Sequence, residues 1–234
     1  MFARSVLALI TLAGLAPSAL LAQHDGHKPA AQPAAQTDAK ARVGDPYPFN
    51  TCPISGMELG SMGEPPAKVY EGREVRFCCA SCFPGFERDV AASLAKLDEK
   101  IVKDQRPLYP LKTSVVSGKP LAEKPVEAVV GNRLFLLTDE AEKGLLGKDP
   151  KKYLLALDRA VIEAQGKDYP LSKCPVSDEA LDSMGGPVDV VVAGRLVRLC
   201  CDGCKEDVEK APARFIAAVD GARKGRRGGD PAGR

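Results

Sequence analysis

The apolar and polar positions divide the chain into an apolar leader, a polar segment and a long stretch in which one local pattern recurs. Residues 1–22 carry a single charge, Arg4, followed by an apolar run that extends to Ala22. Gly14 and Pro17 interrupt this run, which is shorter than the roughly 20 apolar residues that a membrane-spanning helix needs. The pattern is typical of a secretory signal peptide cleaved after Ala22, with an uncleaved anchor as the alternative.

Two further segments have no apolar periodicity. Residues 23–45 are rich in Ala, Pro and Gln, which predicts a flexible linker. Residues 222–234 are basic and rich in glycine, which predicts a disordered tail. The linker holds both histidines, His24 and His27. After cleavage His24 would be the second residue of the mature chain, where the free amine, the imidazole and a backbone amide would chelate a Cu(II)-type ion. Two solvated histidines are the simpler interpretation.

Between these segments a hairpin pattern followed by a helix pattern occurs three times. The first hairpin is predicted over 68–77 with its turn at Glu71-Gly72. The helix after it is marked by apolar residues at Phe86, Val90, Leu94 and Leu97. The third hairpin is predicted over 188–199, with a helix over 204–219 that is kinked at Pro212. The clearest helix pattern, KKYLLALDRAVIEAQG, covers 151–166. We expect an α+β fold of small tandem modules, each a β-hairpin plus a helix.

The amino-acid sequence repeats in step with these patterns. YPFNTCPISGMELGSMGEP at 47–65 matches YPLSKCPVSDEALDSMGGP at 169–187. The four cysteines of the first copy, Cys52, Cys78, Cys79 and Cys82, recur 122 positions later as Cys174, Cys200, Cys201 and Cys204. A third copy begins with YPLKTSVVSGKPL at 109–121; in it Ser114 replaces the first cysteine, and Leu137, Thr138 and Ala141 replace the others. We therefore expect module 1 over 46–106, a degenerate module 2 over 107–167 and module 3 over 168–221.

Composition and charge narrow the classes of function. The net charge is +2 and gives no indication of a nucleic-acid partner. There is no Trp, and aromatic residues are only 5% of the chain, which argues against base-stacking platforms and large aromatic pockets. No Ser-His-Asp set, phosphate loop or paired carboxylate site is visible, and no module contains a histidine. We therefore expect a protein that is not an enzyme.

The cysteines of modules 1 and 3 are candidate metal ligands. The motifs VRFCCASC at 75–82 and VRLCCDGC at 197–204 place cysteines at a strand end and one helical turn further on, and the distant loop cysteine closes the set. Adjacent strand residues point to opposite faces, so we expect three thiolates with an open or weak fourth position. Soft thiolate sites favour Cu(I) and Zn(II), and a nearby helix N-terminus is expected to lower the pKa of a thiol.

Two methionines recur beside these cysteines. Met62 and Met184 each lie ten residues after the first cysteine of their module. Their thioethers are soft donors suited to Cu(I) and are possible additional ligands. The alternative is that each fills a gap in the core.

Two alternatives to metal binding remain open at this point. Exported proteins meet oxidising conditions, and four cysteines would make two disulfides per module, giving a stapled interaction scaffold. A bond between the adjacent Cys78 and Cys79 would be strained, and the middle copy keeps its apolar pattern without any cysteine. The C-x-x-C spacing at a helix start also suggests thiol–disulfide exchange, although no thioredoxin-like context or flanking aromatic residue accompanies it.

The stretches CPISG…VYEGREVRFCCASC and CPVSD…VVAGRLVRLCCDGC resemble the YHS and TRASH-like modules. The resemblance implies small treble-clef-like domains associated with heavy metals in transporting ATPases, efflux components, sensors and proposed metallochaperones. It implies two ligand sets, Cys52, Cys78 and Cys82, and Cys174, Cys200 and Cys204. Cys79 and Cys201 fall where the family has another residue, and their roles as spare ligand, disulfide partner or redox control stay open.

Together these observations predict a periplasmic or secreted protein that captures and transfers copper or zinc through the thiolates of modules 1 and 3. The expected partners are the metal ion and a metal-transport or efflux protein. We expect no nucleic acid as a partner and no transmembrane segment in the mature chain.

Overall fold

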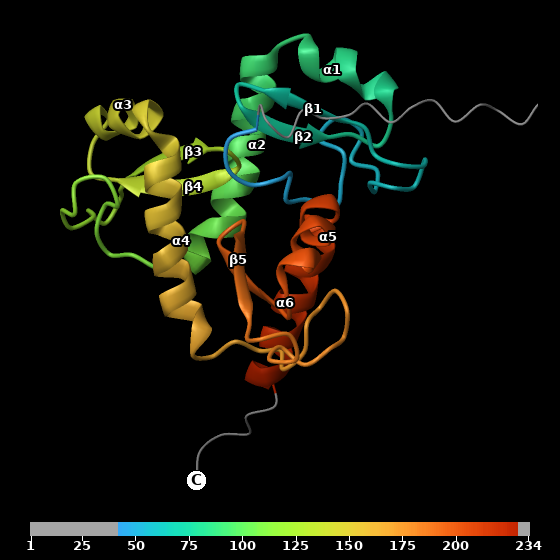
Figure 1. Cartoon of the computed structure of the whole chain (residues 1–234). Helices are drawn as coiled ribbons and strands as arrows, with labels where there is room; N and C mark the ends of the chain where they lie inside the picture. The colour runs from blue at the N-terminus through green and yellow to red at the C-terminus, as the bar shows by residue number, and fades with distance from the viewer. Residues whose placement is uncertain (1–41, 229–234) are drawn as a thin grey trace, which may run out of the picture. The chain divides into compact units, whose positions relative to one another are not determined.

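The computed structural model describes residues 42–228. The predicted signal peptide, His24, His27 and the last residues of the predicted tail therefore lie outside the described residues. Within 42–228, three antiparallel two-stranded hairpins alternate with helices (Figure 1). This arrangement confirms the predicted α+β fold of small modules, each built from a hairpin and helices.

Module 1 contains one hairpin, a short helical segment and one long helix. Its elements are β1 (Ala67–Tyr70), β2 (Arg73–Arg76), the 3-10 turn η1 (Ala80–Cys82), α1 (Phe83–Glu87), α2 (Val90–Gln105) and the 3-10 turn η2 (Arg106–Leu108). Glu71 and Gly72 both have positive φ, as the tight turn of a hairpin requires. The single helix predicted after the cysteines is in fact two. Asp89 leaves the helical conformation and caps α2 by accepting a hydrogen bond of 2.9 Å from the backbone N–H of Ala92.

Module 2 repeats the hairpin and long helix without cysteines. Its elements are β3 (Val126–Val130), β4 (Arg133–Leu137), α3 (Ala141–Lys148) and α4 (Pro150–Gly166). Helix α4 confirms the strongest helix prediction. Asp149 caps it by accepting from the backbone N–H of Lys152, and Pro150 occupies the first helical position, where its missing N–H costs no intrahelical hydrogen bond.

Module 3 follows the same plan with β5 (Val188–Val192), β6 (Arg195–Leu199), the 3-10 turn η3 (Asp202–Cys204), α5 (Lys205–Lys210) and α6 (Pro212–Gly228). The predicted kink at Pro212 is a complete break, because the residue before a proline is driven out of the helical region and Ala211 has φ −134° and ψ 56°. The predicted disordered tail is also wrong in its first part, since α6 continues to Gly228. Alanine, arginine and lysine favour helix there, and Arg223 pairs with Asp220 one turn earlier.

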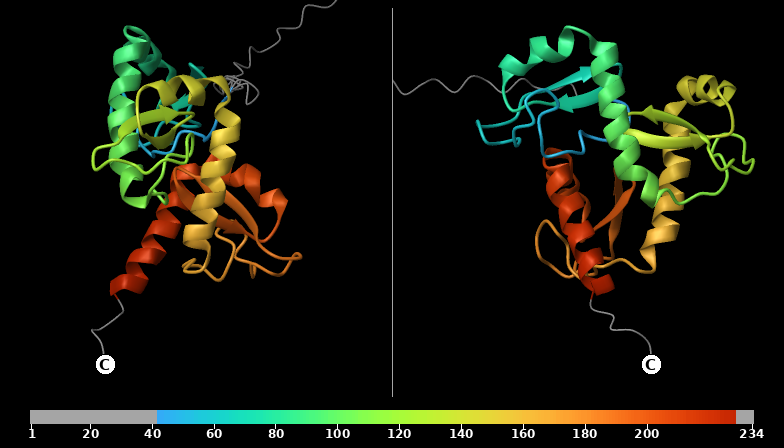
Figure 2. Two further views of the ribbon diagram at one scale, coloured as in Figure 1. Left: turned by 90° about the vertical axis from the view of Figure 1, so that its left-hand side faces the viewer. Right: turned by 180° about the vertical axis from the view of Figure 1, so that it is seen from behind.

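Each long helix of modules 1 and 2 packs against the hairpin of the following module. Helix α2 contacts β3 and β4, and α4 contacts β5 and β6 (Figures 1 and 2). Strand β4 is consequently apolar and buried on both faces. Leu134 and Leu136 belong to the core of module 1, whereas Phe135 and Leu137 belong to that of module 2. The alternation of side chains along a strand therefore joins the two cores.

A glutamine at the end of each of these helices fixes the packing. Gln105 accepts from the backbone N–H of Leu134 at 2.9 Å and donates to the carbonyl oxygen of Asn132 at 2.8 Å. Gln165 makes the same two hydrogen bonds, to Leu196 N–H and the Gly194 carbonyl, at 2.9 and 2.8 Å. Each glutamine thus satisfies backbone groups at the edge of the next hairpin.

Ion pairs repeat in the same way. The first residue of the second strand of each hairpin is an arginine that pairs with an aspartate of the long helix; the pairs are Arg73–Asp98 at 2.5 Å, Arg133–Asp158 at 2.8 Å and Arg195–Asp220 at 3.0 Å. These equivalent contacts show that the three modules share one framework even where their cysteines differ.

The end of the predicted flexible linker is ordered. Asp45 is buried, and its carboxylate accepts from Arg133 through two contacts of 2.9 Å and from the backbone N–H of Ala193 at 2.6 Å. Gly44 and Gly131 lie so close that a Cβ on Gly131 would collide with the carbonyl oxygen of Val43. Residues 42–45 therefore belong to the folded part, because they connect the hairpin turns of modules 2 and 3.

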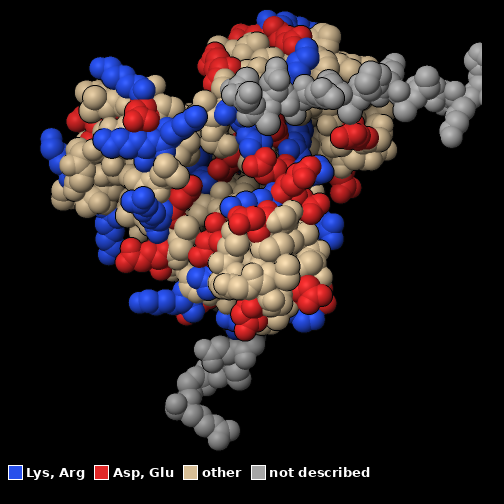
Figure 3. All heavy atoms as spheres, viewed as in Figure 1, with Lys and Arg blue, Asp and Glu red and all other residues tan. Residues whose placement is uncertain are grey.

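On the face shown in Figure 3, acidic and basic side chains are interspersed. Of the helices within 42–228, none has both the length and the apolar composition needed to span a bilayer.

Candidate metal centres

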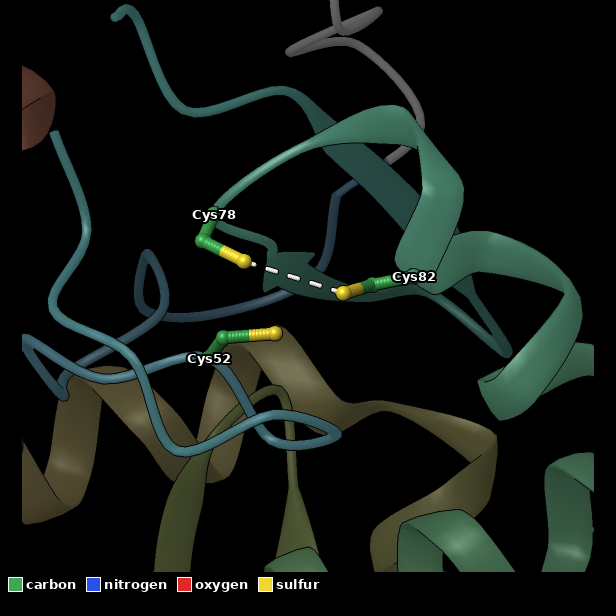
Figure 4. Close-up of side chains that lie close together, drawn as sticks. All are labelled: Cys52, Cys78 and Cys82. Atoms are coloured by element: carbon green, nitrogen blue, oxygen red, sulfur yellow. Dashed lines mark hydrogen bonds between the residues drawn. The ribbon is translucent and has the colours of Figure 1, made fainter. Parts of the chain in front are cut away.

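Three cysteines of module 1 converge from separate stretches of the chain. Cys52 lies in a tight loop whose backbone closes on itself, since Cys52 N–H donates to the Met57 carbonyl at 2.8 Å and Gly56 N–H donates to the Cys52 carbonyl at 3.0 Å. Cys78 follows β2, and Cys82 ends η1. Figure 4 shows the three sulfur atoms facing a common space, and all of them lie within 4.8 Å of one another. The Cys78 and Cys82 sulfurs are 3.7 Å apart.

Module 3 builds the same triad. The sulfurs of Cys174, Cys200 and Cys204 also lie within 4.8 Å of one another. Cys204 Sγ is 3.8 Å from Cys174 Sγ and 3.9 Å from Cys200 Sγ. The three side chains are buried to the same degree as in module 1, with exposed fractions of 1, 3 and 8%. The sequence repeat is therefore a repeat of geometry.

These separations fit a shared ion better than a covalent bridge. All eight cysteines are free thiols, and a disulfide would bring two sulfurs to about 2.05 Å. Sulfurs at the corners of a tetrahedron around Zn²⁺, each about 2.3 Å from the ion, lie about 3.8 Å apart. The observed distances of 3.7 to 3.9 Å match this edge. Each of the two clusters has the donors, the burial and the spacing to hold a metal ion.

The remaining two cysteines stand beside the triads without joining them. Cys79 and Cys201 have almost the same extended backbone, with φ and ψ of −160° and 165° and of −158° and 168°. Both are half-buried rather than buried. Cys79 Sγ is 3.9 Å from Cys78 Sγ, and Cys201 Sγ is 3.9 Å from both Cys200 Sγ and Cys204 Sγ. Neither is a member of the two buried clusters, Cys52, Cys78 and Cys82, and Cys174, Cys200 and Cys204.

Hydrogen bonds stabilise the ionised form of the loop cysteine in each triad. Burial alone would raise the pKa of Cys52, but hydrogen bonds from the Ser55 hydroxyl and from the backbone N–H groups of Ser55, Cys78 and Ile54 lower it to about 6. Burial likewise opposes ionisation of Cys174. There the N–H groups of Ser177, Cys200 and Val176 and the Ser177 hydroxyl lower the pKa to about 6. One thiolate per site is therefore stabilised by the protein itself.

The cysteine beside the short helix behaves in the opposite way. Burial raises the pKa of Cys82 to about 12, together with hydrogen bonds to Cys78 and Cys52 and the negative charge on Cys52. The same causes, with Cys174 in place of Cys52, raise the pKa of Cys204 to about 12. The expectation that a helix N-terminus lowers the pKa of nearby thiols is therefore wrong for Cys82 and Cys204, where burial beside another thiolate outweighs it. It holds for Cys79: burial opposes ionisation there, but the backbone N–H of Ser81 at the start of η1 and neighbouring thiols lower its pKa.

A serine supports each triad, and sequence reasoning missed it. Ser55 Oγ lies 3.2 Å from Cys78 Sγ, and Ser177 Oγ lies 3.3 Å from Cys200 Sγ. Each serine is three residues after the first cysteine of its module, and Ser117 is three residues after Ser114. This recurrence in all three copies is the signal that would have identified the serines. They are placed to hold and orient ligand sulfurs, as groups around a metal's own ligands do.

Module 2 replaces the triad by an oxygen cluster. The equivalent hairpins place Thr138 and Glu142 where the other modules have their second and last triad cysteines, so the predicted alignment of Leu137, Thr138 and Ala141 is wrong by one residue. Glu142 is buried, and its Oε2 accepts from Ser114 Oγ at 2.6 Å and from Thr138 N–H at 2.9 Å. Burial would raise the Glu142 pKa, but hydrogen bonds from Ser114, Ser117 and Thr138 lower it to about 2.

The two recurring methionines are on the surface. Met62 is 59% exposed and Met184 is 67% exposed, and Met57 is exposed as well. The alternative that they fill gaps in the core is therefore wrong. Their predicted role as additional ligands stays a prediction, since neither thioether has a contact with a triad sulfur among the interactions of the described residues.

Comparison of the chain with models of protein families, with curated proteins and with solved structures found no match.

Proposed function

We propose that this chain is an exported carrier that captures one soft metal ion, Cu(I) or Zn(II), in module 1 and another in module 3, and passes them on. The observation that carries the proposal is the convergence of three buried sulfurs from separate stretches, within 4.8 Å of one another, in two copies. Apolar packing explains one buried cysteine, but it gives no reason for three facing sulfurs to recur at metal-ligand spacing.

The surroundings of the sulfurs favour binding of a cation. A soft, polarisable thiolate set suits Cu(I) and Zn(II) far better than Mg²⁺ or Ca²⁺, which prefer oxygen. In each triad the loop cysteine, Cys52 or Cys174, receives several hydrogen bonds and supplies negative charge before the ion arrives. The ion itself would then stabilise the remaining thiolates, because a bound metal cation favours deprotonation of its thiol ligands.

The two candidate metals differ in what they need from the site. Zn²⁺ takes four ligands in a tetrahedron, so it requires a fourth donor beside the triad, such as a water molecule. We propose that Cu(I) is satisfied by the three soft sulfurs of each triad. Coordination number and metal analysis together distinguish these cases.

Module 2 is proposed to be a spacer that binds no soft metal. Its cluster offers hydroxyl and carboxylate oxygens, and the Glu142 carboxylate already accepts hydrogen bonds from Ser114 and Thr138. The leader-like residues 1–22 support export to the periplasm or beyond, and a metal-transport or efflux component is the proposed acceptor. No module contains a histidine, which favours binding and transfer over catalysis.

The test is metal analysis of protein purified without oxygen, together with a thiol count. We expect two ions per chain, and eight titratable thiols after the metal is removed in denaturant. Cys52→Ser should abolish loading of module 1 only, and Cys174→Ser of module 3 only, so each variant should retain one ion. Four disulfides and no metal would support the stapled scaffold instead, and measurable thiol–disulfide exchange would support the redox alternative.

A further inference from the structure

Two triangles of sulfur atoms share an edge in module 3. The sulfurs of Cys200, Cys201 and Cys204 are 3.9 Å apart on all three sides. The buried triad uses the same Cys200–Cys204 edge and adds Cys174 on the other side. Cys174 and Cys201 do not occur together in one close group, so the four sulfurs do not close into one tetrahedron. They form an inner and an outer set of three, each with the spacing of ligands around one ion.

The two triangles differ in their access to solvent. The inner triangle is sealed, since Cys174 is only 1% exposed. The outer triangle contains Cys201, which is half-buried and follows the strand in an extended conformation. A molecule approaching from outside therefore meets the Cys201 sulfur before it can reach Cys174.

Module 1 also has an accessible sulfur beside its triad. Cys79 has the same extended backbone as Cys201, is likewise half-buried, and lies 3.9 Å from the Cys78 sulfur. Its partner across the triad, Cys52, is 1% exposed. An accessible sulfur next to a sealed triad is thus present in both modules that have cysteines, and Asp139 takes its place in the one that has none.

On the basis of the proposed function, we propose that Cys201 and Cys79 are exchange ligands, through which a metal ion enters and leaves the buried triads. In module 3 the ion is held first by Cys200, Cys201 and Cys204. It then moves inward when its bond to the Cys201 sulfur breaks and a bond to the Cys174 sulfur forms, while the two shared sulfurs stay bound. No electrons are transferred.

The protons also balance. When Cys174 binds as a thiolate, any proton that it carried passes to water, and the released Cys201 sulfur takes one up from water. Release of the ion to an acceptor follows the same steps in reverse. The acceptor is a protein with an accessible thiol, and this thiol binds the ion while Cys201 still holds it. Each step exchanges one metal–sulfur bond for another, so the ion is never released free.

The test uses the full chain with Cys52→Ser, so that module 3 alone binds metal. This parent is compared with the same chain carrying Cys201→Ser or, as a matched control, Cys200→Ser. Each is loaded without oxygen with Zn(II), or with Cu(I) kept reduced by ascorbate. The bound ion is counted, and its transfer to a chromophoric chelator is followed by stopped-flow absorbance. Cys79→Ser in a Cys174→Ser background repeats the test in module 1.

We expect Cys201→Ser to keep one ion at an affinity close to that of the parent and to transfer it more slowly by about tenfold or more, the scale on which single groups around a metal site act. Cys200→Ser should not load. An unchanged transfer rate in both modules would show that Cys79 and Cys201 are not on the path of the ion. Loss of metal loading in Cys201→Ser would show that Cys201 is a permanent ligand. Either result overturns the proposal. A parent that binds no metal overturns the proposed function itself, and is recognised before any transfer is measured.

Discussion

Ser114 Oγ donates a hydrogen bond of 2.6 Å to Glu142 Oε2, at the two positions where the neighbouring modules have the first and last cysteines of their triads. The frame of the site is therefore conserved in module 2, while its chemistry has changed from sulfur to oxygen. In the middle module a buried carboxylate takes the place of the sulfurs, and hydroxyl and backbone donors stabilise its charge.

Restoring the sulfurs should create a third metal site. In Ser114→Cys/Thr138→Cys/Glu142→Cys we expect the bound metal to rise from two to three ions per chain, because the hairpin and loop already hold these positions in the geometry of the other triads. The measurement is metal stoichiometry after anaerobic loading. Ser114→Cys alone is the control and should bind two. A triple variant that folds normally and still binds two would show that the frame does not determine the ligand geometry.

The Glu142 carboxylate should make module 2 sensitive to acid. Its pKa is about 2, below the ordinary value of 4.5. The stabilisation that this shift provides, on the order of 3 kcal/mol, is complete above pH 4.5 and is lost as the pH falls towards 2. Glu142→Gln removes it. The difference in unfolding free energy between the two proteins, measured in urea on metal-free samples, should thus be largest near neutral pH and shrink in acid. A difference independent of pH would contradict this assignment.

The serines beside the triads should tune metal affinity. Ser55→Ala removes a hydroxyl 3.2 Å from the Cys78 sulfur, and Ser177→Ala one 3.3 Å from Cys200. Loss of a group that orients ligands typically weakens metal binding by about 10-fold or more, and each change should act only on its own module. Competition with a chelator of known affinity measures the effect. Ser117→Ala, the same substitution in module 2, is the matched control; an equal effect of all three would indicate a change in folding instead.

We expect Asp45 to contribute strongly to stability, although it lies in the predicted linker, before the first residue of predicted module 1. Asp45→Asn leaves the buried Arg133 guanidinium with Asp158 as its remaining carboxylate partner. Breaking a buried ion pair is costly, and with one partner left we expect a loss of about 2 to 3 kcal/mol. Urea unfolding gives the value. The control is Asp182→Asn at an exposed position, which should change the free energy of unfolding by no more than about 0.5 kcal/mol. An equally small effect of Asp45→Asn would show that the contacts of Asp45 contribute little.

The sequence predicted the hairpins, the clearest helix and the two cysteine sets, because each has a local signature: positive-φ turn residues, 3.6-residue periodicity, or exact recurrence of motifs. The alignment of module 2 failed by one residue for a physical reason. The stretch from Ser114 to Thr138 is two residues shorter than that from Cys52 to Cys78. Strand β4 is apolar on both faces, so no alternation fixes where the gap belongs.

Other features depend on contacts between distant segments. Asp45 binds groups of modules 2 and 3, and the glutamines bind backbone atoms about thirty positions away. No periodicity reports such pairs. Asp89 is a helix-capping residue that separates α1 from α2. The apolar positions continue on both sides of it, so the pattern predicts one helix instead of two.

The packing of α2 against module 2 determines whether the modules can be separated from one another. Leu134 and Leu136 of module 2 pack in the apolar core of module 1 with Leu94, Leu97 and Ile101. Val161 of module 2 packs in the core of module 3. If module 1 or module 3 were produced alone, apolar side chains that module 2 covers would be exposed to water. The middle unit, which has no cysteine, therefore covers apolar surface of both neighbouring units and so has a structural role.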